Sequence, residues 1–314
     1  SPTHVDGAPH QGRPRCLEPR PLARRYLGPA GPGSSHPEDA PAAQARTPQD
    51  HRQLANRTRR LKTVRVIDHA ISTLADRRNI LVFTGAGIST ESGIPDFRGP
   101  NGIWKRVDPA DYTFDRYVSD PEFRMNTWGR RFNSPLLDAA PNEAHYAVTR
   151  LWESGRVVGC VTQNIDGLHA AAGLDPSSLV ELHGNAHHIH CISCGDEPPF
   201  GEVEQRWESG TPDPDCLRCG GILKTRVVYF GEELPAQATY RAWDMAERAD
   251  AAIVIGSTLS VYPAAFIPLA VVERGNPMVI VNQGPTDHDF RAAALVDGIA
   301  GSVVPELVDR LSRI

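Results

Sequence analysis

Short apolar runs alternate along this chain with segments whose apolar residues recur every three or four positions. The short runs are Ile80–Phe83, Val157–Thr162, Leu179–Leu182, Ala251–Ile255 and Met278–Asn282. Runs that are this short and apolar throughout are typical of strands buried on both faces of a parallel sheet. The helical period is clearest over Leu61–Leu74, Asn142–Glu153 and Ala236–Arg248. Alternating strands and helices predict an α/β fold with a doubly wound parallel sheet.

Three segments fall outside this alternation. Residues 1–57 hold ten of the 27 prolines and few apolar residues, so we expect a disordered Pro/Arg-rich tail. Residues 96–140 are irregular and rich in aromatic residues and proline, which indicates either a small helical module or a mobile loop. Residues 186–227 are short of apolar runs and carry cysteines, which predicts an insert folded around a metal. The catalytic domain is therefore expected to span residues 58–314.

Four cysteines form two CxxC pairs, Cys191/Cys194 and Cys216/Cys219. Each pair presents two thiolates from one tight turn, and four thiolates complete a tetrahedral Zn²⁺ site without an open position. The sequence therefore predicts one zinc ion that is structural and not catalytic. A nucleic-acid-binding zinc ribbon is the alternative, but acidic residues surround both pairs and the net charge of the chain is −5. We expect no direct binding of nucleic acid.

The apolar content of 40% is enough for a sizeable core, yet no stretch of about 18 apolar residues is present. We therefore expect no membrane span. The N-terminus also lacks the apolar region of a secretory signal. Paired CxxC motifs without such a signal are typical of metal sites in a reducing compartment, so we expect a cytoplasmic protein.

A glycine turn, Gly85-Ala86-Gly87, directly follows the first apolar run. Glycines at this place allow the backbone to approach a pyrophosphate, whose charge the following amides bind. The third glycine of the usual dinucleotide pattern is replaced by Thr90, so an ordinary strand–helix turn remains an alternative. Downstream, Asp96-Phe97-Arg98 lies in a loop that is either a lid over a cofactor or a solvated surface loop.

Polar side chains also follow the second and third runs. Gln163, Asn164 and Asp166 end the second run, and His183 ends the third. Ligands of open α/β sheets bind beyond the carboxyl ends of strands, so these side chains are placed to bind ribose hydroxyls or a carboxamide. An Asx-type turn is the alternative for the first three. A histidine titrates near neutral pH and is suited to act as a general base, although most single histidines are structural.

Taken in order, these motifs resemble the sirtuins, which are NAD-dependent protein deacylases. The resemblance covers about residues 58–314. It rests on GAGIST–ESGIPDFRG at 85–99, TQNIDGLH at 162–169, LHG at 182–184, both CxxC pairs, VVYFGEELP at 227–235, GSTLSVYPA at 256–264 and VNQGPT at 281–286. It implies a Rossmann-like large domain with an inserted small domain that contains a zinc module and a helical module.

The resemblance also implies a reaction. The carbonyl oxygen of an acyl-lysine attacks C1′ of the nicotinamide ribose of NAD, nicotinamide leaves, and a histidine base activates a ribose hydroxyl. Free lysine and O-acyl-ADP-ribose result. By resemblance His183 is the base, and Asn164 and Asp166 are catalytic partners that hold the ribose and the carboxamide. The other expected NAD contacts are Gly85, Ala86, Gly87, Asp96, Phe97, Arg98, Trp104, Gln163, Ile165, Gly256, Ser257, Thr258, Asn282, Gln283 and Gly284.

The expected protein partner is an acyl-lysine protein or peptide. The resemblance implies that it pairs as an added strand with a segment that contains Val228, Phe230, Gly231 and Glu232. Sirtuins that remove acidic acyl groups carry a tyrosine and an arginine three residues apart. Here Thr127 and Arg130 occupy these places, so we expect a neutral acyl group, preferentially acetyl.

Three other functions remain open at this point. A sirtuin-type protein mono-ADP-ribosyltransferase needs the same NAD site. A sensor that binds NAD or ADP-ribose without turnover needs no base, and the presence of His183, Asn164 and Asp166 together disfavours it. A hydride-transfer dehydrogenase is disfavoured by the missing third glycine and by the loop that follows Gly87.

Overall fold

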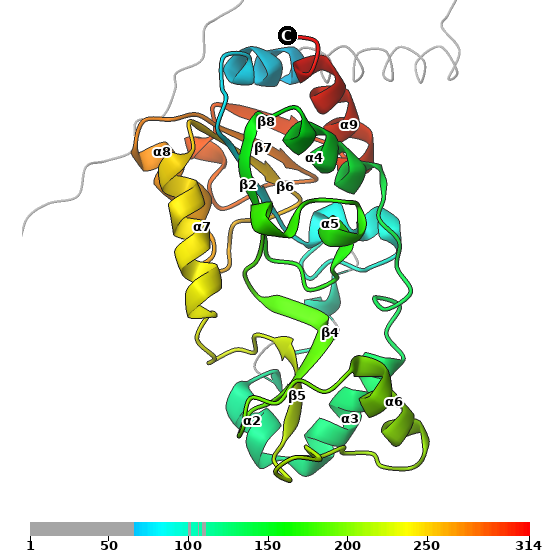
Figure 1. Ribbon diagram of the computed structural model, residues 1–314. Coiled ribbons are helices and arrows are strands. Elements are labelled where there is room, and N and C mark those ends of the chain that lie inside the picture. Colours follow the sequence, from blue (N-terminus) through cyan, green and yellow to red (C-terminus); the bar gives the residue numbers. More distant parts are fainter. Residues whose placement is uncertain (1–65, 100–101, 106, 109–110) are drawn as a thin grey trace, which may run out of the picture. The chain divides into compact units, whose positions relative to one another are not determined.

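The computed structural model of the protein describes residues 66–99, 102–105, 107–108 and 111–314, with the side chain of Trp104 excepted (Figure 1). The tail expected at 1–57 lies outside the described residues. Six parallel strands form one sheet in the order β3–β2–β1–β6–β7–β8. They are β1 (Ile80–Thr84), β2 (Val157–Thr162), β3 (Leu179–Glu181), β6 (Ala251–Ile255), β7 (Met278–Asn282) and β8 (Ala294–Asp297).

The predicted α/β fold with a parallel sheet is confirmed, and the predicted runs coincide with five of these strands to within one residue. The pattern did not identify β8. Its residues alternate between buried and exposed because β8 is an edge strand with one solvated face. A strand of this kind lacks the continuous apolar run by which the other strands are recognised.

Successive residues of each central strand enter two different cores. In β1, Ile80 and Val82 face one core, whereas Leu81 and Phe83 face the other. The helical residues 66–74, α4 (Glu143–Glu153) and α9 (Ala300–Leu311) supply the first core, and α7 (Ala236–Arg248) and α8 (Phe266–Glu273) supply the second (Figure 1). Helices on both faces make the sheet doubly wound, which explains why its strands are apolar throughout.

A smaller layer carries the cysteines. In it β4 (Gly184–Cys191) pairs antiparallel with β5 (Leu223–Val227). The helices α2 (Phe114–Ser119), α3 (Pro121–Phe132) and α6 (Phe200–Glu208) belong to the same part of the chain. Its core is aromatic: the Trp128 ring stacks on Phe132 with centroids 5.3 Å apart and packs with Ile189 and Leu223. The 96–140 segment is thus largely helical from residue 114 to residue 132.

The remaining helices are short and lie mostly at strand ends. They are α5 (Leu168–Ala171) and the 3₁₀ turns η1 (Ala86–Ile88), η2 (Thr90–Ser92), η3 (Ile103–Lys105), η5 (Pro176–Ser178) and η6 (Asp289–Arg291). Within the described ranges, no helix combines the length and the apolar character that crossing a membrane would require.

The sheet order reverses at β1. The chain places β2 and β3 on one side of β1 and later adds β6, β7 and β8 on the other side. In open α/β sheets the connections on the two sides of such a reversal separate, and ligands bind in the resulting crevice at the carboxyl ends of the strands. The topology therefore predicts a ligand site among the residues that follow β1, β2 and β6.

Candidate active site and metal centre

The glycine turn after β1 packs directly on a second glycine turn after β6. The N–H of Gly87 donates to the carbonyl oxygen of Gly256 over 2.9 Å. A Cβ added to Gly85 would lie 2.8 Å from that oxygen, and one added to Gly87 would lie 2.7 Å from the Cα of Gly256. Gly256 itself has φ = +61°, a left-handed conformation that favours glycine. The three glycines are therefore required by the contact between the two turns, whether or not a pyrophosphate is bound.

Asn164 and Asp166, which follow β2, are buried and share one hydroxyl partner. Nδ2 of Asn164 donates to Oγ of Ser89 over 3.1 Å, and Oγ of Ser89 donates to Oδ2 of Asp166 over 2.7 Å. The other carboxylate oxygen of Asp166 accepts the N–H of Leu168 at 3.0 Å. The Asx turn considered from the sequence is therefore present, but it occurs together with a buried polar cluster. Ser89 belongs to the GAGIST motif, but the sequence did not indicate that its hydroxyl joins Asn164 to Asp166.

His183 follows β3, and a backbone carbonyl determines which of its ring nitrogens is protonated. Its Nδ1 lies 3.0 Å from the carbonyl oxygen of Gln163. A carbonyl only accepts, so Nδ1 holds the proton and Nε2 carries the lone pair. No described residue hydrogen-bonds to this Nε2. Burial lowers the pKa of His183 below 6.5, against the opposing effect of the Gln163 hydrogen bond, so the ring is a neutral acceptor at pH 7.

The segment between β2 and His183 is held on both sides. Nε2 of Gln163 donates to Oγ of Ser257 over 2.8 Å, which joins the ends of β2 and β6. The carbonyl oxygen of Ile165 accepts the N–H of Ala186 at 2.8 Å. The ends of β1, β2, β3 and β6 thus meet, as the sequence predicted for their polar residues. Beside Ser257, Oγ1 of Thr258 lies 2.8 Å from Oγ of Ser260.

The end of β7 carries a further predicted group. Nδ2 of Asn282 donates to the carbonyl oxygen of Gly284 over 3.0 Å, and the N–H of Gly284 donates to Asp297 over 3.2 Å. Gln283 lies between them, and all three are at least partly exposed. They follow the same edge of the sheet as the glycine turns, since β7 is parallel to β6. No described contact joins them to His183.

The loop after the glycine turn is folded on itself. Oδ1 of Asp96 accepts the N–H of Gly99 at 2.9 Å, and its carbonyl oxygen accepts the N–H of Ile103 at 2.9 Å. Phe97 is 37% exposed, and Arg98 is exposed as well. An exposed aromatic ring between two charged residues suits a lid. The side chain of Trp104 lies outside the described residues.

The predicted substrate segment adjoins His183. The N–H of Val228 donates to the carbonyl oxygen of His183 over 2.9 Å. The backbone of Phe230 is already paired with a neighbouring segment of the protein: its N–H donates to Tyr112 and its carbonyl accepts from Phe114. The carboxylate of Glu232 faces inward, where it accepts from Nζ of the buried Lys224 at 2.9 Å. Gly231, between them, is exposed.

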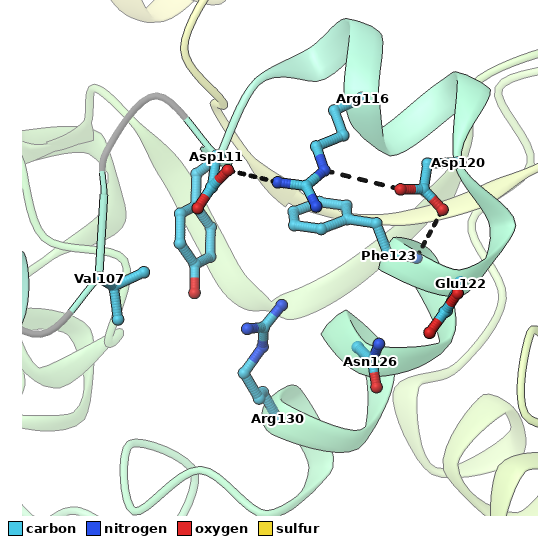
Figure 2. A pocket seen from close by; sticks show the side chains of 9 residues that line it. Val107, Asp111, Arg116, Asp120, Glu122, Phe123, Asn126 and Arg130 are labelled. Carbon is cyan, nitrogen blue, oxygen red and sulfur yellow. Dashed lines mark hydrogen bonds and ion pairs between the residues drawn. The ribbon is translucent and has the colours of Figure 1, made fainter.

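A cavity of about 400 Å³ opens between the segment before α2 and the helices α2 and α3 (Figure 2). In it Arg116 is matched by Asp111 at 2.5 Å and Asp120 at 3.6 Å. Arg130 has no carboxylate within salt-bridge distance in the described structure, and its guanidinium lies 5.3 Å from the centre of the Tyr112 ring. Sequence spacing did not reveal Tyr112 as a neighbour of Arg130 because the two belong to different segments.

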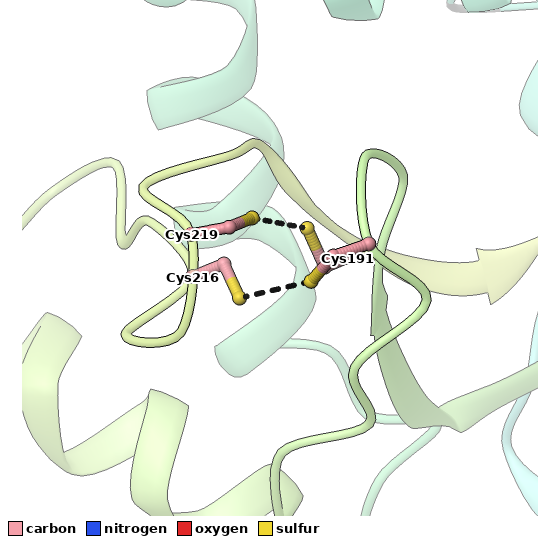
Figure 3. Close-up of side chains that lie close together, drawn as sticks. Cys191, Cys216 and Cys219 are labelled. Carbon is pink, nitrogen blue, oxygen red and sulfur yellow. Dashed lines mark hydrogen bonds between the residues drawn. The ribbon is translucent and has the colours of Figure 1, made fainter.

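The four cysteines converge from two CxxC turns, one at the end of β4 and one before β5 (Figure 3). Sγ of Cys191 lies 3.6 Å from that of Cys219, Sγ of Cys194 lies 3.7 Å from that of Cys216, and all four sulfurs lie within 4.8 Å of one another. Zn–S bonds of about 2.3 Å place the sulfurs of a tetrahedral site about 3.8 Å apart. The donor set therefore fits a structural Zn²⁺, as predicted.

Buried neutral histidines make the stability of the protein depend on pH. Burial lowers the pKa of His145 to about 4 and that of His169 to about 3, from 6.5. Below pH 6.5 the unfolded chain then binds more protons than the folded one, so stability is lost as the pH falls. Each of the two histidines contributes a slope of up to about 1.4 kcal/mol per pH unit. Burial raises the carboxyl pKa of Glu181, so the folded chain binds this proton before the unfolded chain does as the pH falls. This one group therefore partly offsets the loss of stability.

We therefore expect the free energy of unfolding to decrease between pH 6.5 and pH 4. Urea titrations followed by circular dichroism at several pH values would measure the slope. Exchange of His169 for Gln removes one of the titrating rings and should flatten the slope, although the variant starts from a lower stability. A free energy of unfolding that stays constant over this pH range would contradict the neutral assignment of both rings.

Comparison with known proteins agrees with this geometry. The model of the Sir2 family matches residues 85–263, from the glycine turn to the segment after Gly256. The chain belongs to the Sir2 family. An NAD-dependent protein deacetylase of Caldivirga maquilingensis is 45% identical over 241 residues, which cover 77% of this chain and 92% of that protein. NAD-dependent protein deacetylase 2 of Streptomyces coelicolor is 42% identical and covers 73% of this chain and 96% of its own.

A solved Sir2 structure with a deacetylated p53 peptide and 3′-O-acetyl ADP-ribose shares the fold. Its TM-score is 0.72 at 36% identity, and the match covers 78% of this chain and 98% of that one. Another Sir2 structure, bound to an acetylated peptide, has a TM-score of 0.70 at 34% identity, with 78% and 98% coverage. The Rossmann-like fold with a four-cysteine insert, expected from the resemblance, is therefore a property of this chain as a Sir2 family member.

Proposed function

We propose that this Sir2 family protein is an NAD-dependent protein lysine deacylase that releases nicotinamide and O-acyl-ADP-ribose. The observation that carries the proposal is the hydrogen bond of His183: its Nδ1 is bound to the carbonyl oxygen of Gln163, the residue before Asn164, which leaves Nε2 as the unprotonated nitrogen. The names of the relatives, protein deacetylases and deacylases that depend on NAD, support it.

In this proposal, bound NAD supplies the ribose carbon that receives the acyl oxygen and the nicotinamide that leaves. Asn164 and Asp166 hold the ribose and the carboxamide from their buried positions. Nε2 of His183 takes a proton from a ribose hydroxyl, and the lowered pKa of the ring keeps Nε2 unprotonated at neutral pH. Asn164 and Asp166 would thus orient the cofactor, and His183 would transfer the proton.

The remaining NAD contacts follow the strand ends. Gly85, Ala86, Gly87 and Gly256 provide a backbone surface on which the pyrophosphate can lie closely. Ser257, Thr258, Gln163 and Ile165 adjoin this surface. Asn282, Gln283 and Gly284 after β7 would contact the adenosine ribose. Asp96, Phe97, Arg98 and Trp104 belong to the loop that would cover the nicotinamide ribose and exclude water.

The substrate is an acyl-lysine protein or peptide, since acetylated and propionylated peptides occur in the structures of relatives. Gly231 and the carbonyl of Val228, whose N–H is donated to His183, would pair with it as an added strand, and the exposed ring of Phe230 would contact its side chains. Glu232 would contribute indirectly. Its carboxylate accepts the N–H of Tyr229 at 2.7 Å and so stabilises the turn that presents the segment. We propose a neutral acyl group, preferentially acetyl, because Thr127 stands where acid-specific sirtuins carry tyrosine.

Residues 58–314 form the catalytic domain in this proposal, and the thiolate site favours a reducing compartment such as the cytoplasm. No basic field pulls the protein onto nucleic acid, since its net charge is −5.

Product analysis tests the function directly. A panel of acetylated, propionylated, succinylated and myristoylated lysine peptides is incubated with the protein and NAD⁺, and peptide and nucleotide products are read by mass spectrometry. We expect the free-lysine peptide and O-acetyl-ADP-ribose in equal amounts, with acetyl or propionyl peptides turned over at least about tenfold faster than succinyl peptides. ADP-ribose attached to protein without loss of the acyl group would instead identify a transferase, and NAD binding without nicotinamide release would identify a sensor.

A further inference from the structure

Behind the proposed catalytic residues lies a histidine that the reaction does not use. His145 on α4 is fully buried, and its ring centroid lies 5.0 Å from that of His169. Burial lowers the pKa of His145 to about 4, although the nearby Asp166 opposes the shift. The ring is therefore neutral at pH 7 and carries a single proton, so one nitrogen donates and the other accepts.

The backbone of α4 decides which nitrogen accepts. The N–H of Asn142 donates to Nδ1 of His145 over 3.3 Å, as half of the capping box that begins this helix. Since an amide N–H can only donate, Nδ1 is the acceptor and Nε2 holds the proton. This Nε2 lies 3.4 Å from Oγ of Ser89, to which it donates.

The hydroxyl of Ser89 is thereby saturated. A serine hydroxyl has one hydrogen and two lone pairs. Oγ of Ser89 accepts from His145 and from Nδ2 of Asn164, so its hydrogen is directed to Oδ2 of Asp166, 2.7 Å away. One hydroxyl thus holds both the amide of Asn164 and the carboxylate of Asp166, and His145 supplies the third bond that orients it.

We propose that His145 is a positioning residue for the NAD chemistry, which acts through Ser89 on Asn164 and Asp166. The inference rests on the proposed function, because it takes Asn164 and Asp166 as the groups that hold the nicotinamide ribose. Without the donor at Nε2, one lone pair of Ser89 is unsatisfied and its hydroxyl can rotate away from Asp166. Asn164 then keeps only its hydrogen bond to the carbonyl oxygen of Gly85, and Asp166 only the one from the N–H of Leu168, so both side chains are less firmly oriented, although His145 itself touches no ligand.

Two substitutions separate positioning from packing. In His145→Gln, the side-chain amide nitrogen lies near the place of Nε2 and can still donate to Ser89. In His145→Asn, the shorter amide can accept the N–H of Asn142 but cannot reach Ser89. We expect His145→Asn to lower kcat/KM for NAD about tenfold or more, with KM for the acetyl-peptide unchanged, and His145→Gln to stay within about threefold of the wild type.

The matched control is Thr149→Val on the same helix. Oγ1 of Thr149 is buried and donates only to the backbone carbonyls of His145 and Ala172. Its loss should lower the thermal midpoint of unfolding without changing KM for NAD. All kinetics are measured well below the midpoint of each variant. Equal losses in the Gln and Asn variants, or a similar loss in Thr149→Val, would show that His145 contributes packing alone.

A readout without turnover makes the inference independent of the reaction. The ¹⁵N chemical shifts of the His145 ring in the ligand-free protein report which nitrogen is protonated. We expect a protonated Nε2 and an unprotonated Nδ1, and the opposite tautomer would overturn the proposal. If the wild type failed to consume NAD, the proposed function would fall, while the tautomer result would still decide whether His145 orients Ser89.

Discussion

Exchange of His183 for Ala is expected to lower kcat for deacetylation about 10²–10⁴-fold, the contribution typical of a positioned general base. The reason is local: the carbonyl oxygen of Gln163 fixes the tautomer, and Nε2 of His183 carries a lone pair that no described residue occupies. In the wild type the acid limb of kcat/KM should lie below pH 6.5, because burial lowers the pKa of His183 and the base is lost when it is protonated.

His188→Ala is the matched control for this experiment. His188 lies on β4, only five residues along the chain, and its side chain is exposed. Its removal should change neither turnover nor the melting temperature. The zinc content and the circular dichroism spectrum of His183→Ala should equal those of the wild type, since the hydrogen bond of the ring in the described structure goes to a backbone carbonyl and not to another side chain. A rate within threefold of the wild type would sink the assignment of His183 as the base.

Exchange of Cys191 for Ser is expected to release zinc and to destabilise the protein by several kcal/mol, because binding of a structural metal contributes directly to folding. Cys191 is buried at the end of β4, and its neighbours in the core of the small layer include Trp128 and Leu223. Three remaining thiolates bind the ion less tightly, and the two CxxC turns then lose the bond that joins β4 to the segment before β5.

The effect is measured as the zinc stoichiometry by inductively coupled plasma mass spectrometry and as the melting temperature by calorimetry. Ser193→Ala, a change in the same turn at an exposed side chain that is not a ligand, should leave both unchanged. Chelation of the wild type should reproduce the effect of Cys191→Ser. If the melting temperature and the zinc content of Cys191→Ser both equal those of the wild type, the structural role of the metal is refuted.

Local chemistry determined several features that the sequence therefore reveals without the structure. The buried strands are apolar throughout because helices cover both faces of the sheet, and the helix at Asn142–Glu153 is announced by its capping residue. The CxxC pairs carry their own turn geometry, with Gly195 and Gly220 in left-handed conformations after each pair. Edge strand β8 was missed because it has one solvated face and lacks the continuous apolar run of the other strands.

The sequence by itself determined the kinds of groups at the site: glycine turns, amides, a carboxylate, a histidine and four thiolates, each at the end of a recognisable element. Only the tertiary structure decided which of them meet. The reversal of strand order at β1 brings Gly87 against Gly256, and the packing of α4 brings His145 to Ser89. Such contacts join residues 56 to 169 positions apart, and they depend on sheet order and helix packing, which no local pattern encodes.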